Sequence, residues 1–361
     1  MRVLCVAAAR PNFMKIKPVM DALEERGVET ILVHTGQHYD AGMSEVFFTD
    51  LGLRPPDHNL GVGSGSQAEQ TAGVMSSFEP LVERLAPDQV VVVGDVNSTL
   101  ACALVAAKAG ALVAHVEAGL RSRDWSMPEE INRVVTDRLS DFLFAPYADA
   151  VENLQGEGYR PDQVHLVGNV MVDTLLANLD RARQGDTLCR LGVEPGGYGL
   201  ITLHRPATVD DPSVLGRVMG ALGDLARDLP LVFPVHPRTR QTIGEAPPGI
   251  TLLPPAGYLD FIALEAGAAI VLTDSGGVQE ETTVLGIPCL TLRENTERPI
   301  TVTEGTNCLV GRDPARILNE ARRVLQEGVP RRRPALWDGQ AGRRIAEVLV
   351  SSEHRKRPTE R

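Results

Sequence analysis

Short runs of apolar, often β-branched residues alternate with longer amphipathic stretches along the whole sequence. These runs are continuous rather than alternately polar, which is typical of strands covered on both faces and therefore of parallel sheets with connecting helices. The predicted helices of the first half span residues 14–26, 67–85, 98–109 and 129–139. The predicted strands span residues 3–9, 30–33, 89–93, 112–116, 142–144 and 164–167, then 200–203, 231–235, 270–273, 289–292 and 308–310.

The 361 residues contain one long segment rich in glycine and proline, at residues 185–199. A chain of this length corresponds to about two domains at roughly 100–200 residues each. Strands and helices alternate on both sides of the segment. We therefore predict an α/β fold of two doubly wound, Rossmann-like domains that face each other across a cleft, with the boundary at this segment or one helix before it.

The composition argues against several classes of function. Acidic residues outnumber basic ones by 47 to 36, and a net charge of −11 leaves no basic footprint for nucleic acid or an anionic membrane. The five cysteines are scattered without a Cys-x-x-Cys pair, unlike a disulfide framework or a zinc site. No apolar run approaches the roughly 20 residues of a membrane span, and the run at 3–9 is too short for a signal peptide. We therefore expect a cytoplasmic protein that holds any phosphate group through local devices.

Polar and charged residues follow many of the predicted strands. Ligands of open parallel sheets bind outside the carboxyl ends of the strands, so these residues are expected to meet at one site. The site would contain two carboxylates, two histidines, an arginine and a turn of small residues. In chain order the groups are Arg10, Gly94-Asp95, Glu117-Ala118-Gly119, His204-Arg205, His236-Pro237 and Asp274-Ser275-Gly276-Gly277.

The turn at residues 274–277 opens a predicted helix and has two compatible interpretations. Ser275 is suited to the N-cap position, and acidic residues follow in the helix. Gly276 and Gly277 leave the backbone amides uncovered, so a phosphate group can approach the positive end of the helix. The segment does not match the Gly-x-Gly-x-x-Gly fingerprint of dinucleotide-binding proteins.

Residues 126–129 fit a capping box in which Glu129 bonds back to the amide of Ser126. Glu129 and Arg133 are also four residues apart, which predicts an ordinary ion pair on the helix surface. From the residues alone, a structural role for Glu129 is favoured over a catalytic one. The histidines show no spacing typical of a metal site.

A longer series of motifs closely resembles the bacterial non-hydrolysing UDP-N-acetylglucosamine 2-epimerases. The resemblance extends in order from residue 2 to about residue 345, and several motifs span eight or more positions. In the first half it is carried by Arg10-Pro11 with Lys15, Thr35-Gly36-Gln37-His38, Gly94-Asp95 with Ser98-Thr99-Leu100-Ala101, His115-Val116-Glu117-Ala118-Gly119-Leu120-Arg121, and Pro128-Glu129-Glu130 with Asn132-Arg133. In the second half it is carried by Gly168-Asn169, His204-Arg205, Pro234-Val235-His236, Thr273-Asp274-Ser275-Gly276-Gly277 with Gln279-Glu280-Glu281, and Glu297-Arg298-Pro299.

This resemblance implies a fold like that of the GT-B glycosyltransferases. The N-terminal domain would span residues 1–168 and the UDP-binding domain residues 169–339, with a C-terminal helix within 340–361 packed back onto the first domain. The protein would be a homodimer that interconverts UDP-N-acetylglucosamine and UDP-N-acetylmannosamine, without nicotinamide or metal. UDP would be eliminated to give a glycal and then added back, and the product would supply N-acetylmannosamine for cell-surface polysaccharide.

The resemblance also implies roles for individual residues. It favours a catalytic role for Glu129, which the local pattern does not. The implied catalytic residues are Asp95, Glu117, Glu129 and His204. The implied substrate-binding residues are Arg133, Arg10 and Lys15 at the catalytic end, Ser275, Gly276 and Gly277 at the diphosphate, Glu281 at the ribose, Arg298 at the phosphates or sugar, and His236 and Phe261 near the nucleotide.

The chain departs from the family pattern at three places. Family members usually carry an arginine and a Glu-Asn pair after the His-Arg step, whereas this chain continues from His204-Arg205 with Pro206-Ala207-Thr208-Val209-Asp210. Asp40 stands where many members carry glutamine, and residues 61–67 lack an arginine that some members use to hold an activating substrate molecule. We therefore expect catalysis without such an activator. The alternatives left open are a hydrolysing 2-epimerase that releases free N-acetylmannosamine, a GT-B glycosyltransferase and a non-catalytic nucleotide-sugar-binding protein.

Overall fold

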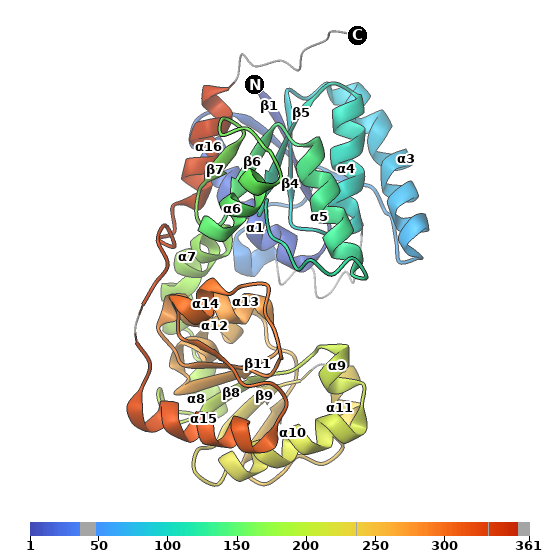
Figure 1. Cartoon of the computed structure of the whole chain (residues 1–361). Coiled ribbons are helices and arrows are strands. Elements are labelled where there is room, and N and C mark those ends of the chain that lie inside the picture. The colour runs from blue at the N-terminus through green and yellow to red at the C-terminus, as the bar shows by residue number, and fades with distance from the viewer. Residues whose placement is uncertain (37–47, 236, 331, 353–361) are drawn as a thin grey trace. The chain divides into compact units, whose positions relative to one another are not determined.

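In the computed structural model, the strands form two separate parallel sheets, one of seven strands and one of six (Figure 1). The structure describes residues 1–36, 48–235, 237–330 and 332–352. Unit 1 contains Met1–Thr174 and Ala335–Arg361, and unit 2 contains Leu175–Pro334. The predicted α/β class with two doubly wound sheets is confirmed. The domain boundaries predicted after residues 168 and 339 lie a few residues from this division. The assignment of the two predicted domains to separate functions stays a prediction.

The elements of unit 1 follow a regular strand–helix order. The strands are β1 (Arg2–Ala7), β2 (Glu29–His34), β3 (His58–Asn59), β4 (Gln89–Val93), β5 (Leu112–Val116), β6 (Phe142–Ala145) and β7 (Val164–Leu166). The helices are α1 (Arg10–Glu24), α3 (Gln67–Leu85), α4 (Asn97–Lys108), α5 (Pro128–Leu139), α6 (Ala148–Gly156), the start of α7 (Val170–Gln184), and α16 (Ala341–Ser351).

Unit 2 repeats this order. Its strands are β8 (Gly199–Thr202), β9 (Leu231–Pro234), β10 (Ile250–Leu253), β11 (Ile270–Thr273), β12 (Cys289–Thr291) and β13 (Asn307–Leu309). Its helices, after the rest of α7, are α8 (Thr187–Leu191), α9 (Pro206–Val209), α10 (Pro212–Leu225), α11 (Pro237–Ile243), α12 (Tyr258–Gly267), α13 (Gly276–Leu285), α14 (Ile300–Thr303) and α15 (Pro314–Glu327). Helix α8 lies inside the segment that the sequence predicts as a break.

Strand order places one reversal in each sheet. The order is β3-β2-β1-β4-β5-β6-β7 in unit 1 and β10-β9-β8-β11-β12-β13 in unit 2. The connections diverge between β1 and β4, and again between β8 and β11. In open α/β sheets, ligands bind beyond the carboxyl ends of the strands at such a point.

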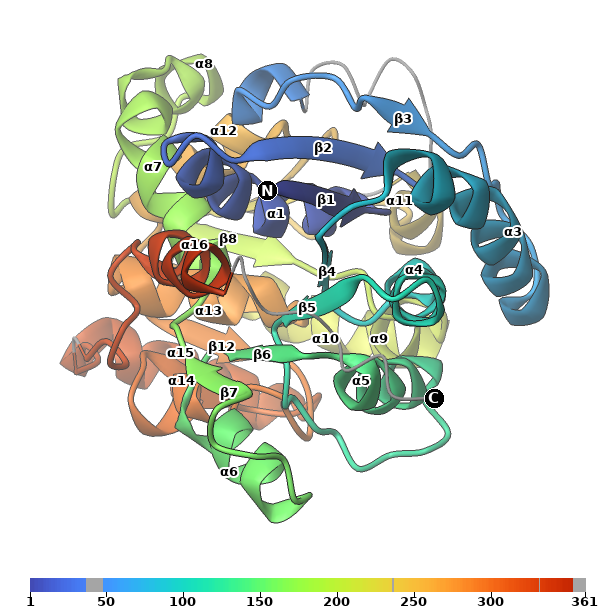
Figure 2. The same cartoon turned by 90° about the horizontal axis from the view of Figure 1, so that it is seen from above.

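Both faces of each sheet are covered, as continuous apolar strands require. In unit 1, α1 packs with α16 while α3, α4 and α5 form a second row (Figure 2). In unit 2, Ile201 packs in the core that contains residues of α10 and α15, whereas its neighbour Leu200 packs in the core that contains residues of α12. This alternation follows from the two-residue period of a strand. Most side chains inside the sheets are thus apolar, and most polar groups are left to the strand ends.

Helix α16 closes unit 1 by packing on α1. Gly342 lies against the α1 backbone so closely that an added Cβ would be 2.4 Å from the carbonyl oxygen of Pro18. Asp173 accepts hydrogen bonds from the amides of Ala341 and Gly342, at 3.1 and 2.7 Å, and so holds the start of the helix. Among the described residues, no helix is both long and apolar enough to cross a bilayer.

Replacing Gly342 with leucine should lower the melting temperature, because a side chain at this position overlaps the α1 backbone. Overpacking of this kind costs about 1–3 kcal/mol. Thermal unfolding followed by circular dichroism measures the effect. Gly216→Leu is the matched control, since Gly216 is exposed in α10 and an added Cβ meets nothing within 4 Å. Equal melting temperatures in the two variants would show that α16 does not need this close contact.

Candidate functional site

In unit 1, helix α1 and the turn after β5 bring a lysine and a glutamate together. Lys15 of α1 donates a hydrogen bond to Glu117, which directly follows β5, and both side chains are largely buried. An added Cβ at Gly94, the residue after β4, would meet Lys15 Nζ at 3.3 Å and Glu117 Oε2 at 3.7 Å. The turn that leads into Asp95 therefore lies beside the Lys15–Glu117 pair.

Asp95 is bound by a residue of α5. Arg133 contacts Asp95 Oδ2 with one Nη atom and Glu130 Oε2 with the other, the latter at 2.9 Å. Asn132 donates to the backbone carbonyl oxygen of Asp95 at 3.0 Å. Because Glu130 and Arg133 are buried, this network fixes the Asp95 carboxylate while leaving about a third of its side chain exposed.

The two structural interpretations of Glu129 are wrong. Helix α5 has Met127 at its N-cap and no side-chain capping bond, and the hydroxyl of Ser126 instead bonds to Asp124. Arg133 pairs with Glu130 rather than Glu129, because its guanidinium is drawn inward to two carboxylates. Glu129 is exposed, and within the described chain it forms no hydrogen bond or ion pair.

In unit 2, a buried carboxylate organises the turn after β8. Asp274, which follows β11, accepts hydrogen bonds from the amides of His204 and Arg205, at 3.1 and 2.9 Å. It also contacts Nδ1 of His204 at 2.9 Å. This contact orients the imidazole, while 55% of the His204 side chain stays exposed.

The same edge of unit 2 contains a pocket of about 260 Å³. It brings three predicted residues together, namely His204, Phe261 and Ser275. Its other lining residues include Pro234, Pro255 and Val278, so its wall is mostly apolar with polar groups at the strand ends. A flat aromatic or heterocyclic group fits such surroundings.

The start of α13 is bare of capping side chains. Ser275 is the N-cap residue as predicted, but its side chain makes no capping bond. Gly276 lies against Arg298, because an added Cβ would be 2.5 Å from one of its Nη atoms. Glu280 contacts Arg298 Nε at 3.0 Å and holds the guanidinium there. Free amides, a helix N-terminus and an arginine together form an anion-binding arrangement.

Glu281 of α13 lies in a cluster of buried acids. Burial, and secondly the charge of Glu280, raises its pKa from 4.5 to about 8. Burial and the charge of Glu281 likewise raise the pKa of Glu265 on α12. At neutral pH Glu281 is therefore protonated, and its carboxyl group can donate as well as accept hydrogen bonds.

Some predicted residues cannot be placed. His236 and Asp40 lie outside the described residues, and the side chain of Arg10 is also outside them. Glu130 and Glu280 hold Arg133 and Arg298, and neither supporting role was predicted from the sequence. The three-residue spacing of Glu130 and Arg133 is typical of an ion pair on one helix, so the sequence contains a signal for that contact. Glu280 and Arg298 lie on separate elements, so no local pattern predicts theirs. The catalytic and binding roles assigned by resemblance stay predictions.

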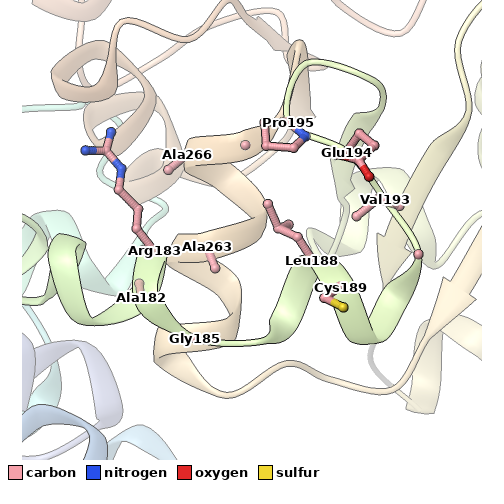
Figure 3. Close-up of a pocket in the computed structure, with 12 residues that line it drawn as sticks. Ala182, Arg183, Gly185, Leu188, Cys189, Val193, Glu194, Pro195, Ala263 and Ala266 are labelled. Carbon is pink, nitrogen blue, oxygen red and sulfur yellow. The ribbon is translucent and has the colours of Figure 1, made fainter.

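A larger pocket of unit 2, of about 620 Å³, contains none of the predicted residues (Figure 3). It is lined by Leu188, Val193, Ala263 and Ala266, among others. Its segments precede β8 and β11, so it lies at the amino ends of the strands, away from the edge where ligands of such sheets bind. In the described ranges, no group of three or more histidine, cysteine, aspartate or glutamate residues is arranged to hold a metal ion.

Comparison with known proteins places this chain among sugar-nucleotide epimerases. The family described as UDP-N-acetylglucosamine 2-epimerase matches residues 21–350. The UDP-N-acetylglucosamine 2-epimerase of Methanocaldococcus jannaschii is 39% identical over 98% of this chain and 100% of its own length. The UDP-2,3-diacetamido-2,3-dideoxy-D-glucuronate 2-epimerase of Pseudomonas aeruginosa is 41% identical over 97% of this chain and 99% of its own length.

Solved structures agree with the predicted fold class. The Methanocaldococcus jannaschii UDP-GlcNAc 2-epimerase, in complex with UDP-GlcNAc and UDP, matches with a TM-score of 0.87 at 39% identity, over 97% of this chain and 100% of that chain. The glycosyltransferase SnogD from Streptomyces nogalater matches with a TM-score of 0.57 at 16% identity, over 97% of this chain and 95% of that chain. The latter shows a shared fold alone, and the GT-B-like prediction is confirmed.

The raised pKa of Glu281 predicts a loss of stability with increasing pH. Between pH 4.5 and about 8, the folded protein keeps a proton on Glu281 that the unfolded chain releases, so stability falls as the pH rises through this range. Glu281→Gln removes this contribution and should narrow the difference between the melting temperatures at pH 5.5 and pH 8.5. The exposed Glu79→Gln is the control and should leave that difference unchanged. The same difference in wild type and Glu281→Gln would mean that Glu281 ionises normally.

Proposed function

The chain belongs to the UDP-N-acetylglucosamine 2-epimerase family, and on that premise we propose that it interconverts UDP-N-acetylglucosamine and UDP-N-acetylmannosamine. UDP leaves C1 to give a glycal and is then added back with the opposite configuration at C2. The product supplies N-acetylmannosamine for cell-surface polysaccharide. The enzyme acts in the cytoplasm as a homodimer, and it needs neither nicotinamide nor metal.

The observation that carries this proposal is the pair of carboxylates at adjacent strand ends of unit 1. Glu117 is bonded to Lys15, and Asp95 is bonded to Arg133. Strands β4 and β5 are hydrogen-bonded neighbours, so both carboxylates belong to one edge of the sheet. Inversion at C2 requires proton transfer on both faces of the sugar, and two or more positioned carboxylates suit that requirement.

The first step is departure of UDP. The C2 proton has no adjacent carbonyl carbon and is only weakly acidic, so its direct removal would be very slow. Breaking the C1–O bond first, or together with proton removal, creates an oxocarbenium-like sugar and places negative charge on the pyrophosphate. The amides at the start of α13 and the guanidinium of Arg298 stabilise that charge.

The second step is proton transfer at C2. A carboxylate removes the proton from the oxocarbenium-like sugar, and the electron pair of the C–H bond becomes the C1–C2 double bond of the glycal. Protonation from the opposite face, together with attack of UDP at C1, gives the epimer. Asp95, Glu117 and Glu129 are the proposed proton-transfer groups, and the ion pairs with Arg133 and Lys15 hold Asp95 and Glu117 in position.

The nucleotide is assigned to unit 2. In this proposal the uracil occupies the pocket that contains Phe261, and the ribose hydroxyls bond to Glu281. The diphosphate binds at Ser275, Gly276 and Gly277. The observed mixture of apolar wall and bare helix N-terminus supports this assignment.

A second substrate has a specific observation in its favour. The Pseudomonas aeruginosa relative, at 41% identity, is named for a sugar with a second acetamido group at C3 and a carboxylate at C6. The same elimination and re-addition at C2 serves both sugars. UDP-2,3-diacetamido-2,3-dideoxy-D-glucuronate is therefore the alternative substrate to test.

Incubation with UDP-N-acetylglucosamine in deuterated water tests the proposal. Both epimers should appear as UDP-sugars in the proton NMR spectrum, with deuterium at C2 of the product, because carboxylates exchange their protons with solvent between the two transfers. Asp95→Asn, Glu117→Gln and Glu129→Gln should each slow the exchange by on the order of 10²–10⁴. Glu152→Gln, at an exposed position of α6, is the control.

Other outcomes separate the alternatives. Accumulation of UDP and free N-acetylmannosamine would identify a hydrolysing enzyme. Turnover that requires an acceptor, without exchange at C2, would identify a glycosyltransferase. Exchange only with the diacetamido glucuronate would replace the substrate and keep the reaction. A normal rate in Glu129→Gln would exclude that exposed residue from proton transfer.

Substitution at the start of α13 should abolish nucleotide binding. Gly276→Asp places a negative charge and a side chain where the diphosphate is proposed to bind, and it also displaces Arg298. Isothermal titration calorimetry with UDP should therefore show no detectable binding. Gly220→Asp, the same change at an exposed site of α10 where an added Cβ meets nothing within 4 Å, should bind UDP like wild type. Unchanged affinity in Gly276→Asp would move the nucleotide site elsewhere.

A further inference from the structure

Two fully buried residues of unit 1, His115 and Asp137, form a network that the proposed mechanism does not use. His115 lies on β5 and Asp137 on the last turns of α5, and neither side chain has any exposed surface. His115 Nδ1 contacts Asp137 Oδ1 at 2.6 Å. Nε2 of the same ring lies 2.8 Å from the carbonyl oxygen of Gly94.

The other oxygen of Asp137 reaches the turn after β5. Asp137 Oδ2 accepts a hydrogen bond from the amide of Gly119 at 3.1 Å and forms an ion pair with Arg121 at 2.7 Å. Gly119 lies two residues after Glu117, and Gly94 lies one residue before Asp95, so each glycine belongs to the turn of one carboxylate. One buried pair thus bonds to the backbone of both turns that present the carboxylates.

The turn at Glu117 needs such support. Glu117 has φ +71°, in the left-handed region that a residue with a Cβ rarely adopts. A conformation of this kind costs of order 1–3 kcal/mol and persists only where the surroundings fix it. The bond from the Gly119 amide to Asp137 fixes the end of that turn. Lys15 bonds to the Glu117 side chain but not to the backbone of the turn.

Both ring nitrogens of His115 have a hydrogen-bonding partner. One partner is the carbonyl oxygen of Gly94, which can only accept, and the other is an oxygen of the Asp137 carboxyl group. Burying an unpaired carboxylate is costly, whereas Asp137 here has a hydrogen-bonding partner on each oxygen. Loss of either partner would leave polar groups unsatisfied directly beneath the two turns.

We propose that His115 and Asp137 are positioning residues for the C2 proton transfer: together they fix the backbone turns that place Asp95 and Glu117. The inference rests on the proposed function. Neither residue needs to contact the sugar, and nucleotide binding in unit 2 does not depend on them. Their loss should therefore lower kcat with little effect on KM or on UDP affinity.

The test compares kcat, KM and the calorimetric Kd for UDP in wild type, His115→Phe, His115→Gln and Asp137→Asn. We expect His115→Phe to lose roughly 10²-fold in kcat, the cost of about 1 Å of misplacement, while KM and Kd stay within about twofold. Glutamine can still donate to the Gly94 carbonyl, so His115→Gln should recover part of the rate. His165→Phe is the matched control, because His165 packs against Phe144 in the same unit, at 5.6 Å between ring centroids.

Three results would overturn the inference. The first is a wild-type kcat in His115→Phe. The second is a lower kcat together with a higher KM and a weaker affinity for UDP, which is the pattern of general unfolding. If His115→Phe shows no cooperative unfolding transition, the folded His115→Gln and Asp137→Asn variants decide, and a wild-type kcat in both rejects it. Absence of turnover by the unmodified enzyme on either sugar nucleotide would instead remove the proposed function, and this inference with it.

Discussion

Coverage of both faces of two parallel sheets is the constraint on which the rest of this protein depends. Helices on each side force the strand interiors to be apolar, as the neighbouring Leu200 and Ile201 show by packing into different cores. Most polar groups then lie at or near the strand ends, and the reversals beside β1 and β8 leave room for a ligand there. The residues proposed to act on the substrate therefore lie in these turns or on the helices beside them, as Lys15 of α1 and Arg133 of α5 do.

Those turns are held by ion pairs and buried carboxylates. Asp274 bonds to two amides in the turn after β8, and Asp137 bonds to the amide of Gly119 after β5. The groups proposed to act on the substrate are in turn paired with ions of opposite charge, as Glu117 is with Lys15 and Arg298 with Glu280. Such pairs limit the cost of placing charge in a poorly solvated site and fix its direction.

The sequence predicts the strands that are buried on both faces well. It predicts the edge strands of the sheets and the ion pairs between distant residues poorly. The continuous run at β4 is predicted with its observed bounds, whereas β10 was missed because it is an edge strand with Thr251 exposed. Helix spacing suggested a pair between Glu129 and Arg133. In the fold, Arg133 instead reaches Asp95 on another element, which no local pattern reveals. Strand-end positions indicate which residues are functional, but their partners depend on the tertiary structure.

In the proposed mechanism, unit 2 binds the nucleotide and unit 1 carries out the proton transfer. Calorimetric titration of UDP into the Glu117→Gln variant tests it most directly, because this change alters a unit 1 carboxylate without altering its size. We expect this variant to bind UDP with the wild-type Kd, although it no longer exchanges the C2 proton at the normal rate. A Kd that weakens in step with the lost rate would contradict it, since Glu117 would then contribute to nucleotide binding itself.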